Sequence, residues 1–233
     1  MKNVISCPGC SAENPIYQLN CIGCKAYLRG RVVNVDFWKT IGSLLESPFK
    51  TFLILIQSEH KNFLIPTFCL FAIKFFINGL IFSHIVHDYH GSLNYLLLNL
   101  GLSVIYSLII LIAFSFIITR INKGFGIANR FRDNLTIYIF ALVPQLITLI
   151  VLFPLEYAVF GVHWITFNPS PFVIRGGTAY IFAIIEGLMI LWSLFLAISA
   201  TYTQTKSKIY SVFVGFVYII VIFGGMIFLP NFH

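Results

Sequence analysis

Four cysteines near the start of the chain have the spacing of a metal site. They form two C-x2-C pairs separated by ten residues: Cys7, Cys10, Cys21 and Cys24. Two residues between paired cysteines let one tight turn direct both sulfurs at one ion, and the Pro8-Gly9 and Ile22-Gly23 inserts suit such turns. Four thiolates favour a closed tetrahedral Zn²⁺ site with no open position for catalysis. We therefore predict one structural zinc ion, with an iron–sulfur cluster and a redox dithiol as the alternatives.

Residues 1–30, which contain these cysteines, form a short polar module. So few residues bury too little apolar surface to fold alone. Metal binding to peptides of this kind releases on the order of 10 kcal/mol or more, which supplies the folding free energy. The module resembles the short zinc ribbons that are fused to prokaryotic membrane proteins. We expect a structural role, with a docking surface for a protein partner as a further role.

The remainder of the chain has the composition of a membrane protein. Hydrophobic residues make up 58% of the 233 residues and charged residues only 10%, against about 25% charged in soluble domains. The net charge of +7 does not indicate a nucleic-acid partner, because the basic residues are scattered in short gaps between apolar runs. The lipid bilayer is the partner that this pattern predicts.

Five apolar runs are long enough to cross a hydrocarbon core about 30 Å thick as helices. Lipid-exposed strands would leave backbone groups unpaired, so these runs must be helical. We predict an all-α membrane protein, a five-transmembrane-helix bundle over residues 63–233, preceded by the zinc-ribbon-like module and by a linker over residues 31–62. The predicted spans are 63–86, 93–118, 135–154, 179–201 and 209–229.

Lysine and arginine positions predict the orientation of the bundle. Thirteen of the fifteen lie before the first span, between the second and third, or between the fourth and fifth. Only Arg175 lies in the other gaps, and Lys74 lies within the first span. By the positive-inside rule, the N-terminus is cytoplasmic and the C-terminus lies outside. The resemblance of the cysteine module to zinc ribbons of prokaryotic membrane proteins implies a prokaryotic cell membrane. Cytoplasmic thiols stay reduced, which agrees with metal ligation rather than disulfides.

The linker contains an amphipathic stretch over residues 36–57. Its apolar residues recur at three- and four-residue steps, which is typical of helices. Ser47-Pro48 predicts the start of a second helix, with serine as N-cap and proline as its first residue. We predict two short helices on the cytoplasmic interface, anchored by Trp38 and lysines. Packing of these helices against the bundle is the alternative.

Two charged residues, one lysine and one glutamate, fall inside the predicted spans. Lys74 lies midway along the first span and Glu186 in the first half of the fourth. A charge at a helix centre costs about 2.5–3.5 kcal/mol on insertion scales, so these side chains should face the protein interior or water. They can form a buried structural pair or belong to an ion or proton pathway. Glu156, near the outer end of the third span, is expected to be solvated, and Cys69 to be a packing residue.

The segment HIVHDYH offers a second candidate metal site, formed by His84, His87, His90 and Asp88. Histidine and tyrosine are also ordinary interfacial residues. The chain contains no GxxxxGK[ST], GxSxG or HExxH motif. We therefore predict that it is not an enzyme.

Three segments resemble the Yip-one superfamily, the Ypt/Rab-interacting membrane proteins. They are SPFKTFLILI before the first span, YIFALVPQLI in the third, and LWSLFLAISATYTQTKSKIYSV across the fourth and fifth. The resemblance covers about residues 37–229. It implies a helical bundle in trafficking or membrane organisation, often with small GTPases as partners. The chain lacks the acidic-aromatic-glycine-proline motif of eukaryotic members and resembles the prokaryotic branch.

Two functions therefore follow as hypotheses. The first is a non-enzymatic membrane scaffold or adaptor, either alone or as a homo-oligomer. The second is a small-solute or ion permease that uses Lys74 and Glu186.

Overall fold

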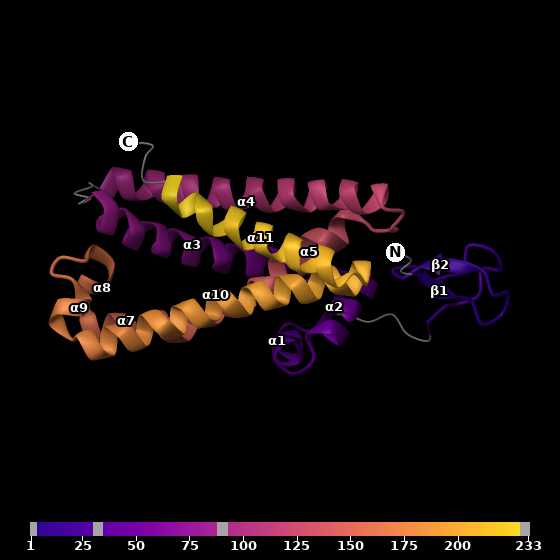
Figure 1. Cartoon of the computed structure of the whole chain (residues 1–233), viewed down its shortest axis with the longest axis horizontal. Helices are drawn as coiled ribbons and strands as arrows, with labels where there is room; N and C mark the ends of the chain where they lie inside the picture. The colour runs from indigo at the N-terminus through magenta and orange to yellow at the C-terminus, as the bar shows by residue number, and fades with distance from the viewer. Residues whose placement is uncertain (1–3, 30–34, 88–92, 229–233) are drawn as a thin grey trace. The chain divides into compact units, whose positions relative to one another are not determined.

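The structure is a computed structural model that describes residues 4–29, 35–87 and 93–228 (Figure 1). Two short antiparallel strands, β1 (Val4–Ser6) and β2 (Glu13–Pro15), pair with Ile5 opposite Asn14. All other regular elements in the described ranges are helical. They are α1 (Phe37–Glu46), α2 (Pro48–Gln57), α3 (Leu64–His87), α4 (Leu93–Gly124), α5 (Phe131–Ala141), α6 (Val143–Ile147), the π-helix η1 (Thr148–Leu152), α7 (Phe153–Phe160), α8 (His163–Thr166), α9 (Pro171–Ile174), α10 (Gly176–Thr205) and α11 (Lys208–Phe228).

Five helical segments within the described ranges are long and apolar enough to cross a membrane. These segments are Leu64–Ile85, Leu96–Gly124, Val143–Phe160, Gly176–Thr205 and Lys208–Gly225. Each of the five predicted spans overlaps one of them. The expectation of a mainly helical, multi-pass membrane protein is therefore confirmed at the level of helix length and composition.

The third span is an interrupted helix rather than a continuous one. α5 ends at Ala141, and a new helix begins at Val143 with Pro144 in its first turn. Proline has no backbone N–H, and its ring collides with the carbonyl four residues earlier. A π-helical turn follows, in which the N–H of Phe153 donates to the carbonyl of Thr148, one residue before Pro154. The candidate membrane-spanning segment in this region is Val143–Phe160, which overlaps the predicted span over residues 135–154.

The predicted boundary between the two linker helices is confirmed, because α1 ends at Glu46 and Pro48 is the first residue of α2. The prediction that Ser47 caps α2 is wrong for its side chain, which makes no capping hydrogen bond. Asp36 does cap α1, since its carboxylate accepts from the N–H of Lys39 at 3.0 Å. α2 buries Phe52, Leu55 and Ile56, whereas α1 leaves 74% of Trp38 exposed.

The chain folds as two compact units, which are described separately. Unit 1 comprises residues 1–65, 111–141 and 195–216, and unit 2 comprises residues 66–110, 142–194 and 217–233.

The core of unit 1 contains aromatic rings and hydrogen-bonded polar side chains. The buried hydroxyl of Tyr138 lies 3.0 Å from Oγ1 of Thr201 on α10, and the ring of Phe114 meets that of Tyr138 edge to face. Tyr210 donates to Oδ1 of Asn122 at 2.9 Å. These bonds satisfy polar atoms that would be costly to bury alone.

Unit 2 holds its helices together with aromatic contacts. Tyr106 on α4 stacks on Phe75 of α3 with ring centroids 5.6 Å apart. Its hydroxyl donates to the carbonyl of Val221 on α11 at 2.8 Å. Trp164 of α8 stacks on Phe160 of α7 at 5.3 Å.

Candidate metal centre and buried charged groups

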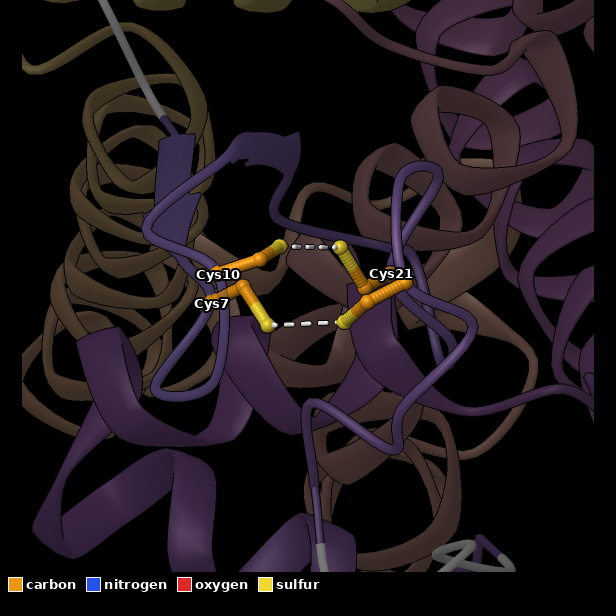
Figure 2. Close-up of side chains that lie close together, drawn as sticks. Cys7, Cys10 and Cys21 are labelled. Atoms are coloured by element: carbon orange, nitrogen blue, oxygen red, sulfur yellow. Dashed lines mark hydrogen bonds between the residues drawn. The ribbon is translucent and has the colours of Figure 1, made fainter.

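The four predicted cysteines lie together in unit 1. Their sulfurs are all within 4.8 Å of one another. Cys10 Sγ lies 3.5 Å from Cys21 Sγ, and Cys7 Sγ lies 3.6 Å from Cys24 Sγ. Figure 2 shows Cys7 and Cys10 on one side of the site and Cys21 on the facing side. Four sulfurs bound tetrahedrally at about 2.3 Å would be about 3.8 Å apart. The geometry is therefore compatible with one metal ion, and none of the described cysteines is in a disulfide.

Two similar turns position these sulfurs. In the first, the N–H of Cys7 donates to the carbonyl of Ala12 at 3.0 Å, and the N–H of Ser11 donates back to Cys7 at 2.9 Å. In the second, Cys21 donates to Ala26 at 2.8 Å and Lys25 donates back to Cys21 at 3.1 Å. The residue after each pair, Ser11 or Lys25, has a left-handed backbone with φ of 56° or 62°. The turns are thus two copies of one local structure.

Backbone N–H groups in these turns point at the sulfurs and favour the thiolate form of two of them. The N–H groups of Cys10 and Gly9 lower the pKa of Cys7. The N–H of Cys24, with support from Asn14 and Gly23, lowers the pKa of Cys21 to about 6. The pKa of Cys24 is raised, because the neighbouring Cys10 and Cys7 outweigh the opposite effect of the Ala26 N–H. Metal ligation requires thiolates, so these turns prepare the site for a cation.

Asn14 supports the cysteine cluster and was not identified from the sequence. The side chain is fully buried. Nδ2 donates to the carbonyl of Ala12 at 2.8 Å and lies 3.5 Å from Cys21 Sγ, while Oδ1 accepts from the N–H of Ile22 at 2.8 Å. The side chain thereby joins the two turns. The pattern ENP in the sequence is a common turn composition and gives no sign of this role.

Side-chain contacts attach the cysteine module to the helices of unit 1. Arg29 donates to the last carbonyl of α2, that of Gln57, at 2.9 Å and to the carbonyl of Tyr17 at 3.1 Å. The guanidinium of Arg130 lies 4.4 Å from the centre of the Tyr17 ring. The same guanidinium donates to the carbonyl of Ile56 at 3.4 Å. Two arginines thus connect the module to the C-terminus of α2.

A buried carboxylate, Asp133 on α5, organises the same region. Its oxygens lie 3.0 Å from Lys61 Nζ and 2.8 Å from Arg130 Nε. Lys61 also donates to the carbonyls of Leu55 and Ile56. Burial lowers the pKa of Lys61, an effect that the Asp133 carboxylate opposes. The basic residues satisfy the unpaired carbonyls at the end of α2, where positive charge is favourable.

In unit 2, Lys74 and Glu186 form an ion pair. Nζ lies 2.5 Å from Oε1, and the side chains are 2% and 19% exposed. The two residues are 112 positions apart in sequence, on α3 and α10. The pairing that their positions allowed is therefore present in the structure.

Glu156 differs from its expected environment. The sequence predicted a solvated residue, yet Glu156 is fully buried on α7. Neither carboxylate oxygen has a hydrogen-bond partner among the described residues. Lys74 and Glu186 both act on it electrostatically, and the Trp164 indole lies beside it. Trp164 of α8 lies in a hydrophobic cluster with Phe160 of α7, and Phe172 of α9 packs against this cluster.

The structure describes the side chains of two of the remaining predicted residues, His84 and Cys69. His84 on α3 directs Nδ1 at the carbonyl of Leu80, 2.8 Å away. The His87 side chain, Asp88 and His90 lie outside the described residues. Cys69 is exposed on the surface of α3 and does not pack in the core.

Comparisons with protein-family models, with curated proteins and with solved structures found no match.

Proposed function

We propose that this chain is a non-enzymatic multi-pass membrane scaffold or adaptor whose cysteine module holds one structural Zn²⁺ at the cytoplasmic face. The convergence of four sulfurs within 4.8 Å, in a chain with five helices long and apolar enough to cross a membrane, carries the proposal. A closed four-sulfur site supports a structural role, since it leaves no coordination position for a substrate.

The surroundings of the module support its cytoplasmic placement. Basic residues cluster in the same unit, and the positive-inside rule assigns such residues to the cytoplasm. α1 exposes Trp38 and Leu45, and α2 exposes Phe49 in its first turn. Aromatic and aliphatic side chains next to lysines suit the membrane interface. The resemblance to the Yip-one superfamily adds membrane organisation or trafficking as the process served.

Metal analysis of the purified full-length chain tests the metal. We expect one zinc per chain, and its loss in Cys21→Ser. The matched control is Cys69→Ser, which removes a thiol outside the cluster. Iron in place of zinc, with visible absorption from a cluster, would contradict the zinc assignment.

Crosslinking and affinity capture in native membranes test the adaptor role. Captured proteins that are present with Cys69→Ser and absent with Cys21→Ser would support docking at the module. An unchanged set of captured proteins in Cys21→Ser would contradict it.

A second function, a small-solute or ion permease, is favoured by the ion pair between Lys74 and Glu186. Charged residues within membrane spans often lie on ion or proton pathways. Liposomes containing the purified chain should then show a solute or ion flux that Lys74→Met and Glu186→Gln reduce. Absence of flux, or flux unchanged in both variants, would exclude this function.

A further inference from the structure

Among the described residues of unit 2, the carboxyl groups of Glu156 and Glu186 both interact with a single ammonium group, that of Lys74. Glu186 is bonded to Lys74 at 2.5 Å. Glu156 interacts electrostatically with both residues and, least of all, with the N–H of the Trp164 indole. No donor within the described ranges meets either of its oxygens in full hydrogen-bond geometry. With all three groups ionised, the cluster would carry one uncompensated negative charge.

An uncompensated charge at this position would be very unfavourable. Glu156 is fully covered by protein, and its helical segment is one of the candidate membrane spans. Burying an ionised carboxylate without a partner costs far more than burying a neutral carboxylic acid, so such groups take up a proton. The single ammonium of Lys74 is already held by Glu186.

We propose that Glu156 is a proton-binding site in the interior of unit 2, a neutral carboxylic acid at neutral pH beside the ion pair of Lys74 and Glu186. The proton makes the three-residue cluster electrically neutral. The site lies outside the cysteine module, and it does not depend on the scaffold function.

The surroundings of Glu156 favour a proton over a metal cation as the occupant. A sodium or divalent ion needs several oxygen ligands. The hydrophobic cluster that α7 joins through Phe160 offers no oxygen ligand, since its other members are Trp164 and Ala179, with Phe153 and Phe182 packed against it. The charged groups acting on Glu156 are Glu186 of α10 and Lys74 of α3, α8 contributes the Trp164 indole, and α7 itself carries Tyr157.

Dicyclohexylcarbodiimide tests the proposal on the purified full-length chain. This apolar reagent reacts with protonated carboxyl groups. The acid proton moves to a carbodiimide nitrogen, the carboxyl oxygen bonds to the central carbon, and the adduct rearranges to a stable N-acylurea without loss of atoms. At neutral pH we expect peptide mass spectrometry to find the adduct on Glu156. Glu186, which is paired with Lys74, and the exposed Glu46 should stay unmodified.

Two variants should change the carbodiimide labelling of Glu186 and Glu156 in opposite directions. In Lys74→Met, Glu186 loses its partner and should become labelled as well. In Glu186→Gln, Lys74 is freed to balance Glu156, so labelling of Glu156 should fall at least several-fold. Labelling of Glu186 in Lys74→Met without labelling of Glu156 in any variant would overturn the proposal.

Infrared spectroscopy gives a readout that does not depend on access of the reagent. The neutral-pH spectrum should contain a C=O stretching band of a protonated carboxylic acid that is missing in Glu156→Gln. If the two spectra do not differ in this band, the proposal is wrong. Loss of the band on addition of sodium would likewise overturn it, because the occupant would then be a metal cation.

Discussion

At the scale of single residues, the chain contains charged groups whose effect on the stability of the fold depends on their partner. Lys74 and Glu186 are an example, because each would be a costly buried charge without the other. Removing one partner of a buried pair leaves the other charge uncompensated, whereas removing both can be nearly neutral.

A double-mutant cycle on this pair should show that asymmetry. We expect Lys74→Met to reduce the free energy of unfolding by about 3 kcal/mol, and Lys74→Met/Glu186→Gln to recover most of the loss. The free energies of unfolding of Lys74→Met, of Glu186→Gln and of the double variant, each relative to the original chain, are measured on the detergent-solubilised protein by circular dichroism. Additive effects of the two substitutions would show that the pair does not interact.

Asn14 should tune the metal affinity of the cysteine cluster. Side chains that orient metal ligands typically change affinity by about 10- to 100-fold when removed. Asn14→Ala should therefore weaken metal binding by at least about tenfold, measured by competition with a chromogenic chelator. Asn20→Ala, at an exposed position of the same module, is the control and should retain the original affinity. Equal affinities in the two variants would refute the role of Asn14.

At the scale of elements, the C-terminus of α2 is held by side chains from three separate parts of the chain. Arg29, Lys61 and Arg130 each donate to one or more of its last carbonyls. Because a guanidinium can reach two carbonyl groups at once, Arg29 also connects α2 to the cysteine module.

Arg29→Lys should loosen this connection while keeping the charge. A single ammonium cannot donate to Gln57 and Tyr17 in the geometry of the fork. We expect faster amide hydrogen exchange in residues 4–29 and at the end of α2 in Arg29→Lys. The control is Lys39→Arg, the reverse substitution at an exposed position of α1, which should leave the pattern of amide hydrogen exchange unchanged. Unaltered exchange in Arg29→Lys would mean that the module is held by other contacts.

The packing of α10 on α11 in unit 1 depends on Gly215. A Cβ at this position would overlap the Ile198 side chain and lie 3.3 Å from its backbone nitrogen. Overpacking of this kind costs about 1–3 kcal/mol, so Gly215→Ala should lower the unfolding temperature. Gly187→Ala provides a matched control within α10, because nothing lies within 4 Å of its added Cβ. If the two variants unfold alike, the close helix approach at Gly215 is not needed for stability.

At the scale of the whole molecule, the charge distribution predicts which termini and loops face the cytoplasm. In a Cys69→Ser background, a cysteine at Ser170 should react with a membrane-impermeant maleimide added to intact cells. A cysteine at Ser207 should react only after the cells are opened. Labelling in the opposite order would invert the predicted topology and place the cysteine module outside.

Composition and local patterns were sufficient to predict much of this protein. Membrane spans are determined by the length of apolar runs, because a helix must satisfy its own backbone in lipid. The two C-x2-C turns are equally local, since each forms within six residues, from Cys7 to Ala12 and from Cys21 to Ala26. Both features could be read from the order of residues alone.

Other features depend on residues brought together from distant parts of the chain, and only the tertiary structure reveals them. The sequence predicts a solvated Glu156 because the residue lies near the end of a span, but the fold buries it fully. Arg29 and Asp133 read as ordinary charged residues until the fold placed them at the end of α2. A charge has the same identity in any sequence, but its free energy depends on burial and on the partner it meets. Those are properties of the packed molecule, so the fold decides which charges are paired and which must take up a proton.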